Sequence, residues 1–184
     1  MGATIPIAVG AALAAKMGGG DEVAVAFFGD GATEEGVFHE TINFCALNKL
    51  PVLFICENNL YSVYSSMSVR QPKNRSIAKM VNAMGVKSFC INGNDVCKIY
   101  KITARELSKI RSGLGPRFFE FKTYRWREHC GPNFDNDIGY RSEEEFLSWK
   151  EKDPIVRAKK ELLDNKLITT REINQIIKSI EKEV

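Results

Sequence analysis

The sequence predicts an α/β protein with a doubly wound parallel sheet flanked by helices. Two short, continuously apolar runs, at residues 23–28 and 51–56, have the pattern of strands buried in a parallel sheet. Each run stops at a polar loop, and a helix-like stretch lies between the two. Open α/β sheets bind their ligands at the carboxyl ends of the strands, so we expect the two loops to meet at one edge.

Three further segments complete the first half of the predicted fold. Residues 5–17 are small and apolar almost all round, which is typical of a buried helix, and the glycines at 18–20 end it. Residues 60–75 show no periodicity and are predicted to form a surface loop. A helix is predicted at 34–48, with a core-facing stripe formed by Val37, Thr41, Phe44, Ala46 and Leu47.

A second α/β repeat follows. Its predicted elements are a helix at 77–84, a strand at 86–91, a helix at 96–111 and a strand at 117–122. Ser76 and Asp95 stand at the expected N-caps, where a side-chain oxygen accepts a hydrogen bond from a free backbone N–H group of the first turn. We expect this repeat to be scaffold.

Residues 142–184 predict a helical extension to an α/β domain that spans residues 1–141. Ser142 and Thr169 each precede a glutamate by three positions, which is the capping-box pattern, and Asp153 precedes a proline. The last helix carries one apolar stripe, formed by Ile173, Ile176, Ile177 and Ile180. Such a stripe must be covered, and we expect this chain's own domain to cover it, with a partner subunit as the alternative.

Composition narrows the class of protein. A hydrophobic fraction of 44% and a charged fraction of 27% are those of a soluble globular protein, and a net charge of +3 is too small to indicate a nucleic-acid partner. No apolar run reaches bilayer length, and the start lacks the basic region of a signal peptide. The five cysteines lack CxxC spacing and favour neither a disulfide framework nor a zinc site, so we expect a cytoplasmic protein.

The two loops at the predicted sheet edge carry groups suited to a diphosphate and a metal ion. The first loop, GDGATEEG, places Asp30 between two glycines that let backbone N–H groups approach a phosphate, and a helix N-terminus follows. The second loop, ENNLY, offers the amide oxygen of Asn59. One carboxylate, one amide oxygen and a main-chain carbonyl suit a magnesium ion that takes its other ligands from phosphates and water.

These motifs resemble the signature of the thiamine diphosphate enzymes, in which GDG is followed by a helix, a strand and NN. The stretch from Gly29 to Asn59, GDGATEEGVFHETINFCALNKLPVLFICENN, is similar to the alpha subunit of the 2-oxo acid dehydrogenases that act on pyruvate, branched-chain substrates and acetoin. The similarity runs from residue 1 to about residue 155. Each motif alone is also an ordinary turn, but the pair in a strand–helix–strand context favours a cofactor site.

The resemblance implies thiamine diphosphate and Mg²⁺ as cofactors. It assigns metal ligation to the Asp30 carboxylate, the Asn59 side chain and the main-chain carbonyl of Tyr61. It assigns the diphosphate contacts to the backbone amides of Gly31 and Ala32.

The loop after the last predicted strand, TYRWREHC at residues 123–130, resembles the family's TYRxxGHS stretch. The match makes Arg125 and His129 the catalytic candidates, with His129 also a cofactor contact. A histidine can exchange protons near neutral pH, which suits a catalytic role for His129. The alternative is that His129 is a solvated loop residue without a catalytic role. Glu128 replaces a glycine, and Cys130 replaces the serine that mitochondrial relatives use as a phosphosite, so kinase control through that position is not expected.

The start of the chain departs most from the family pattern. Family members carry cofactor contacts in a segment before the first helix, and this sequence does not contain that segment. Met1 falls where the family places an apolar residue under the thiazolium ring, which makes it a candidate cofactor contact. The alternative, a bare initiator at a truncated start, is favoured because chain termini are usually poorly ordered.

The resemblance implies oxidative decarboxylation of a small 2-oxo acid, with transfer of the acyl group to a lipoyl-bearing acyltransferase component. A beta-type subunit would complete the active site, so the chain is expected to be inactive alone. The alternatives are another thiamine diphosphate enzyme subunit, transketolase-like or acyloin-forming, and a truncated non-catalytic subunit. A metal-dependent phosphatase or nucleotide-binding module would need a second carboxylate at the metal, which the NN loop does not offer. Neither nucleic acid nor membrane is an expected partner.

Overall fold

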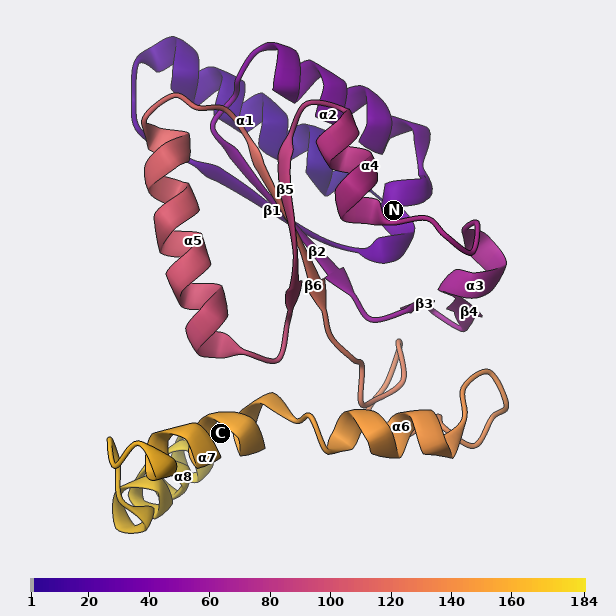
Figure 1. Cartoon of the computed structure of the whole chain (residues 1–184), viewed down its shortest axis with the longest axis vertical. Helices are drawn as coiled ribbons and strands as arrows, with labels where there is room; N and C mark the ends of the chain where they lie inside the picture. Colours follow the sequence, from indigo (N-terminus) through magenta and orange to yellow (C-terminus); the bar gives the residue numbers. More distant parts are fainter. Residues whose placement is uncertain (1) are drawn as a thin grey trace.

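The computed structural model describes residues 2–184 (Figure 1). Its main sheet has four parallel strands in the order β1-β2-β6-β5. The strands are β1 (Ala24–Gly29), β2 (Val52–Asn58), β5 (Lys87–Asn92) and β6 (Arg117–Lys122). The helices beside the sheet are α1 (Thr4–Gly18), α2 (Gly36–Leu47), α4 (Ile77–Ala83) and α5 (Val96–Arg111).

Helices cover both faces of this sheet, which confirms the predicted doubly wound α/β class. Phe54 and Cys56 of β2 join a core cluster with side chains of α1, α2 and α4. Leu53 and Ile55, which alternate with them along the strand, join a second cluster with α5. Figure 1 shows the same arrangement, with α5 on the opposite side of the sheet from α1 and α2.

Strand β1 departs from the sequence prediction, because its run of apolar residues suggests burial on both faces. Within the described residues β1 is an edge strand, paired with β2 alone. Ala26 and Phe28 are buried, whereas Val25 and Phe27 are 43% and 59% exposed. Apolar continuity alone therefore does not separate a central strand from an edge strand.

The helix predicted at 34–48 is shorter and rotated. A 3₁₀ turn, η1 (Asp30–Glu34), comes first, and α2 begins at Gly36. Its buried face is formed by Phe38, Thr41, Ile42 and Cys45. Of the predicted stripe, Thr41 is buried and Ala46 packs against the core, whereas Phe44 and Leu47 are exposed, so the prediction is wrong for these two.

The surface loop predicted at residues 60–75 is ordered in a different way. It forms a hairpin of β3 (Tyr61–Ser62) and β4 (Ser65–Ser66), followed by one helical turn, α3 (Met67–Arg70). Tyr61 and Gln71 are buried. The segment lacks periodicity because its order comes from contacts with distant parts of the chain, such as those of Arg70 with Asp30 and of Tyr61 with Glu145.

The C-terminal helices are α6 (Glu143–Lys150), α7 (Pro154–Asp164) and α8 (Thr170–Glu183), and they lie beyond the carboxyl edge of the sheet (Figure 1). Phe146 of α6 packs with Tyr61 and Tyr124 in a small aromatic cluster. Helix α8 contains no buried residue, and Ile176 and Ile180 are 51% and 53% exposed. The described part of the chain therefore leaves this half of the stripe uncovered, contrary to expectation.

No helix between residues 2 and 184 combines the length and the apolar character that crossing a bilayer requires.

A buried ion cluster fixes α5 to β6 at the amino end of the sheet. The Glu106 carboxylate accepts hydrogen bonds from Arg105 Nε (2.8 Å), Lys109 Nζ (3.0 Å) and Arg117 Nε (2.9 Å). Arg117 also donates to three backbone carbonyls at residues 114–116. Burial raises the pKa of Glu106, but the hydrogen bonds from Lys109, Arg117 and Arg105 outweigh it, so the pKa lies below its ordinary value.

We expect Glu106→Gln to lower the free energy of unfolding at neutral pH by about 3 kcal/mol, because it leaves Arg117 buried without its counter-charge. The folded pKa is depressed, so this stabilisation is present above the unfolded pKa and is lost as the pH falls below about 4.5. Urea unfolding at neutral and acid pH measures the difference, with the exposed Glu40→Gln as control. A gap between wild type and Glu106→Gln that persists unchanged into acid would contradict the charge-based account.

Candidate functional site

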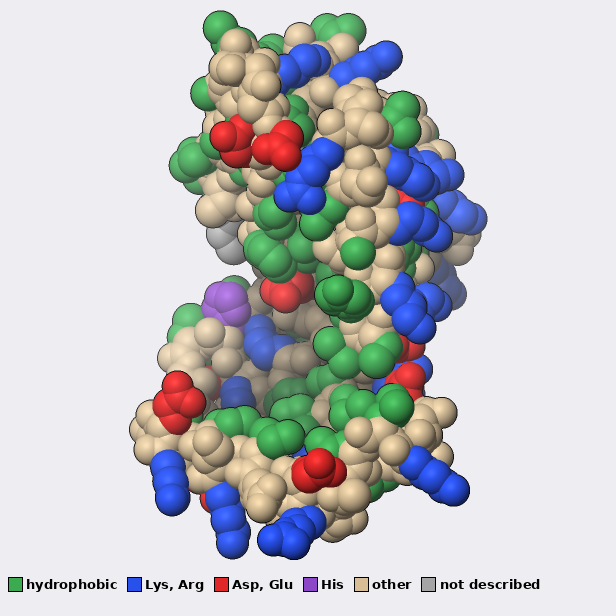
Figure 2. Space-filling view, turned by 90° about the vertical axis from the view of Figure 1, so that its left-hand side faces the viewer, with side chains coloured by type: hydrophobic (Ala, Val, Ile, Leu, Met, Phe, Trp, Pro, Cys, Tyr) green, Lys and Arg blue, Asp and Glu red, His purple; other side chains and the backbone are tan. Residues whose placement is uncertain are grey.

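Three loops meet at the carboxyl edge of the sheet, where β1, β2 and β6 end in register. Gly29 is level with Glu57, and Asn58 with Lys122. A cavity of about 290 Å³ opens between these loops. Six of the residues predicted to bind cofactor or metal line it: Asp30, Gly31, Ala32, Asn59, Tyr61 and His129. Figure 2 shows the molecule hollowed between the sheet domain and the C-terminal helices, with hydrophobic side chains along the lower rim.

The first loop buries the Asp30 carboxyl group at the end of β1. Gly29 ends the strand in an extended conformation, and η1 turns the chain at once. Thr33 Oγ1 donates to the Asp30 carbonyl at 2.7 Å and closes the turn. The side chain of Asp30 is 1% exposed, so its charge must be compensated by the protein or by a ligand.

The two asparagines of the NN pair have different roles. Asn58 is fully buried, and its Nδ2 donates to Glu120 Oε1 at 2.8 Å, which ties β2 to β6. Asn59 lines the cavity, and its Oδ1 accepts the backbone N–H of Tyr61 at 3.0 Å. Asn58 is therefore scaffold, whereas Asn59 presents an oxygen at the site.

Gly31 allows the hairpin to close over the first loop. A Cβ atom at this position would lie 2.7 Å from Ser62 Oγ and 3.0 Å from Ser62 Cβ. The hydroxyl can rotate away, but the Cβ atom moves only with the backbone of β3. The sequence suggested that Gly31 frees backbone amides for a phosphate, and this close approach is a second reason for glycine here.

We expect Gly31→Ala to destabilise the fold by about 1–3 kcal/mol, because overpacking forces the hairpin and the first loop apart. Ser62→Gly in the same chain should recover most of that loss, measured against Ser62→Gly alone by urea unfolding. Gly36→Ala is the matched control, because a Cβ there meets no atom within 4 Å. Equal losses at the two glycines would remove the case for this contact.

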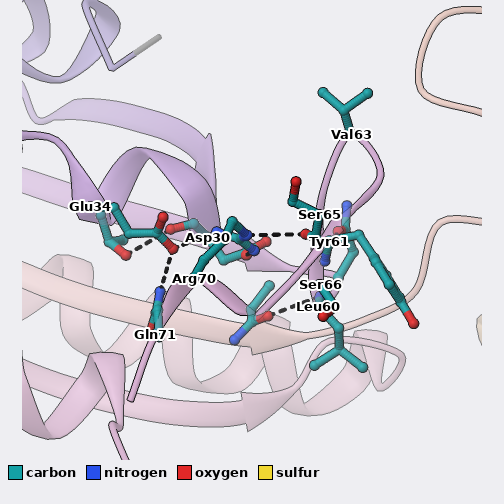
Figure 3. Close-up of polar contacts among 12 residues, drawn as sticks. Asp30, Glu34, Leu60, Tyr61, Val63, Ser65, Ser66, Arg70 and Gln71 are labelled. Atoms are coloured by element: carbon teal, nitrogen blue, oxygen red, sulfur yellow. Dashed lines mark hydrogen bonds and ion pairs between the residues drawn. The ribbon is translucent and has the colours of Figure 1, made fainter. Parts of the chain in front are cut away.

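An arginine that sequence analysis did not single out pairs with the Asp30 carboxylate, although it does not itself line the cavity (Figure 3). The Arg70 guanidinium forms ion pairs with Asp30 and Glu34, and its Nε donates to the Ser65 carbonyl at 3.0 Å. Gln71 Nε2 donates to the same Glu34 carboxylate at 2.8 Å. One signal could have found Arg70: a buried Asp30 requires a cation, and the nearby segment is basic.

The two catalytic candidates of the third loop lie in different surroundings. His129 lines the cavity and is exposed, and it forms no hydrogen bond within the described residues. Arg125 does not line the cavity; its Nη2 donates to the Val63 carbonyl at 3.0 Å and to the Tyr140 hydroxyl at 2.9 Å. Arg125 therefore connects the third loop to the hairpin. Met1, another predicted cofactor contact, falls outside the described residues.

Helix α6 holds the hairpin from the other side. The hydroxyls of Tyr61 and Tyr124 donate to the Glu145 carboxylate at 2.9 and 3.0 Å. Burial, followed by the hydrogen bond to Glu145, raises the pKa of Tyr61 above its ordinary value. The predicted capping box at Ser142 is therefore only half formed: the Ser142 hydroxyl accepts the Glu145 N–H, but the Glu145 carboxylate serves the tyrosines. The box at Thr169 is complete.

The donors at the cavity fit a hard cation that shares its coordination sphere with an anionic ligand. Among residues 2–184, no three His, Cys, Asp or Glu side chains gather into a metal site. Asp30 and Asn59 supply oxygen ligands only, and an ion there must take the rest from main-chain carbonyls, phosphate or water. No lysine or arginine among the described residues lines the cavity, so these residues supply no cationic side chain to a bound diphosphate.

The fold and the site together define an α/β protein with a largely apolar cavity at the carboxyl edge of a parallel sheet, into which Asp30 and Asn59 bring oxygen atoms. The family model described as "Dehydrogenase E1 component" matches residues 1–184, the whole of the chain. The chain therefore belongs to the dehydrogenase E1 component family, as the GDG and NN motifs predicted.

Similar proteins carry two related names. The chain is 38% identical over 186 residues to the pyruvate dehydrogenase E1 component subunit alpha of Rickettsia felis, covering 100% of this chain and 56% of that protein. It is 39% identical over 169 residues to the 3-methyl-2-oxobutanoate dehydrogenase subunit alpha of Mycobacterium tuberculosis, covering 92% and 45%. The chain thus spans about half the length of the curated relatives it matches.

Among solved structures, a putative thiamin diphosphate-dependent enzyme from Mycobacterium smegmatis aligns with a TM-score of 0.49 and 23% identity. The alignment covers 66% of this chain and 22% of the other.

Proposed function

We propose that this chain acts as the alpha subunit of a thiamine diphosphate-dependent 2-oxo acid dehydrogenase. The observation that carries the proposal is the convergence of three loops on one cavity, which is lined by Asp30, Gly31, Asn59 and His129. Family membership supports the same reading, since relatives in the family are named as alpha subunits of dehydrogenases for pyruvate and for a branched-chain 2-oxo acid.

The metal-binding half of the proposal rests on the oxygen atoms at the cavity. Asp30 and Asn59 would hold Mg²⁺ through their side chains, and Tyr61 through its main-chain carbonyl. The backbone amides of Gly31 and Ala32 would contact the diphosphate, because both residues line the cavity beside Asp30. When bound, thiamine diphosphate would supply the nucleophilic carbon that attacks the 2-oxo acid.

The third loop would supply the proton-transfer group. His129 is exposed at the cavity and makes no internal hydrogen bond, so its imidazole is free to face a substrate or an incoming lipoyl group. Arg125, which sequence analysis placed with it as catalytic, is better proposed as a positioning residue. It reaches the Val63 carbonyl rather than the cavity and thereby holds the third loop against the hairpin.

Partners are part of the proposal. A beta-type subunit would complete the cofactor site, and a lipoyl-bearing acyltransferase component would receive the acyl group. The proposed division places cofactor and metal binding in residues 1–141 and assigns a packing role to residues 142–184. The half-exposed isoleucines of α8 support a partner subunit there. A location in the cytoplasm stays a prediction.

We expect Asp30→Ala to weaken Mg²⁺-dependent thiamine diphosphate binding by at least about 100-fold, the upper end of losses seen for residues that support a metal. Titration calorimetry on the chain with its beta-type partner measures the affinity, and the chain alone shows how much the partner adds. Asp21→Ala is the control, an exposed aspartate before the other end of β1 with no ion pair. Binding that survives Asp30→Ala would refute the proposed metal ligand.

We expect His129→Ala to lower kcat for 2-oxo acid oxidation by about 10²- to 10⁴-fold, the range for loss of a general acid–base group. Cofactor affinity should change little, because the diphosphate contacts come from the first loop. The assembled enzyme is assayed with a lipoyl acceptor, next to calorimetry. The second histidine provides the control, His39→Ala on α2, which packs edge-on against Phe38 away from the cavity. Equal activity of the two variants would exclude a catalytic role for His129.

A further inference from the structure

We propose that Arg70 is a resident counter-ion of Asp30 that a divalent cation must displace. The inference rests on the proposed function, because it takes Asp30 to be a metal ligand. It adds a residue from α3, outside the GDG and NN motifs, that sets how tightly the site holds metal. Arg70 is a positioning residue in this role, since it acts on the cation through Asp30.

The first support is the set of contacts around the guanidinium. Three groups hold Arg70: the Asp30 carboxylate, the Glu34 carboxylate and the Ser65 carbonyl. Its side chain is 12% exposed, and that of Asp30 is 1% exposed. Figure 3 shows Arg70 between Asp30 and Glu34, with Gln71 reaching Glu34 from the same segment. The guanidinium is therefore fixed rather than a mobile surface group.

The second support is that no other basic side chain among the described residues forms an ion pair with Asp30. Among the residues that the structure describes, Arg70 is the one basic side chain paired with this carboxylate. A magnesium ion binds carboxylate oxygen directly at about 2.0–2.1 Å, which brings its two charges against a guanidinium on the same group. Repulsion between like charges in a poorly hydrated site makes joint occupancy unfavourable.

The third support is that Arg70 has somewhere to go. Glu34 and the Ser65 carbonyl remain as partners when the contact to Asp30 is lost. Glu34 also keeps the hydrogen bond from Gln71. A short movement of the guanidinium toward Glu34 thus frees the Asp30 oxygen without exposing an unpaired charge. The exchange replaces one cation on Asp30 by another.

A purely structural role for Arg70 makes the opposite prediction. If the guanidinium only fastens α3 to η1, removing it loosens the first loop and metal binding weakens or stays the same. If Arg70 competes with the metal, removing it strengthens metal binding. The sign of the change in metal affinity therefore separates the two roles.

The test uses Mn²⁺ as the metal probe, on the full chain assembled with its beta-type partner and without thiamine diphosphate. Free Mn²⁺ is counted by electron paramagnetic resonance. Arg70→Gln should lower the Kd for Mn²⁺ by about tenfold. This is the gain expected when the competing state, with Arg70 paired to Asp30, is populated to about 90% in the wild type and is removed by the substitution. The Kd of Arg70→Lys for Mn²⁺ should lie between those of wild type and Arg70→Gln, because a lysine cannot span both carboxylates. An unchanged or raised Kd in Arg70→Gln overturns the proposal.

Two controls make the result specific. Lys73→Gln removes the same charge three residues away, where the side chain is exposed and makes no polar contact, and it should bind Mn²⁺ as wild type does. Asp30→Ala separates this inference from the proposed function. Loss of Mn²⁺ in Asp30→Ala with no gain in Arg70→Gln rejects only the role of Arg70, whereas binding that ignores Asp30→Ala rejects the metal site itself.

A measurement on the wild-type assembly covers the case in which an Arg70 variant does not fold. Adding Mn²⁺ should speed amide hydrogen exchange in residues 65–71, because one of the three contacts that hold Arg70 is lost. Mass spectrometry of peptides from this segment reports the change. Exchange that is unchanged or slower on Mn²⁺ addition overturns the proposal.

Discussion

The Asp30 carboxylate is the constraint on which the arrangement of this sheet edge depends. An ionised carboxylate withdrawn from water is costly unless a cation and hydrogen bonds compensate it. Arg70 provides the cation from α3, so the segment that follows the NN loop is drawn back over η1. Gly31 makes this closure sterically possible, because the missing Cβ leaves room for Ser62. The buried charge of Asp30, the position of the hairpin and the glycine at residue 31 therefore depend on one another.

Buried carboxylates also hold the sheet at both ends. At the carboxyl edge, Glu120 of β6 accepts from Asn58 and from the backbone of Ala78, which links β2, β6 and α4. At the amino edge, Glu106 links α5 to β6 through Arg117. The apolar side chains in the middle of the sheet pack against the helices on both faces. The carboxylates near its two ends each accept hydrogen bonds from particular donors, and these bonds link particular strands and helices to one another.

The sequence predicted the parts of the fold that depend on local periodicity. The strands and the helices α1, α4 and α5 lie close to their expected positions, because a buried run or a capped amphipathic stretch contains its own signal. It failed at residues 60–75, where order comes from contacts with Asp30 and Glu145, which lie far away in the chain. The rotated face of α2 has a similar cause, since η1 shifts the helix start.

The candidate site divides along the same line. The GDG and NN motifs predicted which residues would meet, because a parallel sheet brings adjacent strand ends together. The catalytic candidates of the third loop were predicted only from the family resemblance. In the structure His129 lines the cavity, whereas Arg125 does not and instead donates to the Val63 carbonyl of the hairpin. A motif predicts which loop a residue belongs to, but the hydrogen bonds that its side chain makes determine whether that side chain faces the cavity.

Charge at the cavity gives the proposed function an order of events. Asp30 and Glu34 contribute two negative charges and Arg70 one positive charge, so the cluster is net negative. A diphosphate alone would meet repulsion there, and among the described residues only backbone amides would attract it. A divalent cation at Asp30 reverses the sign of the cluster and turns the cavity into an anion site. In the proposed function, a cation at Asp30 would therefore favour diphosphate binding, and Arg70 would set the affinity for that cation.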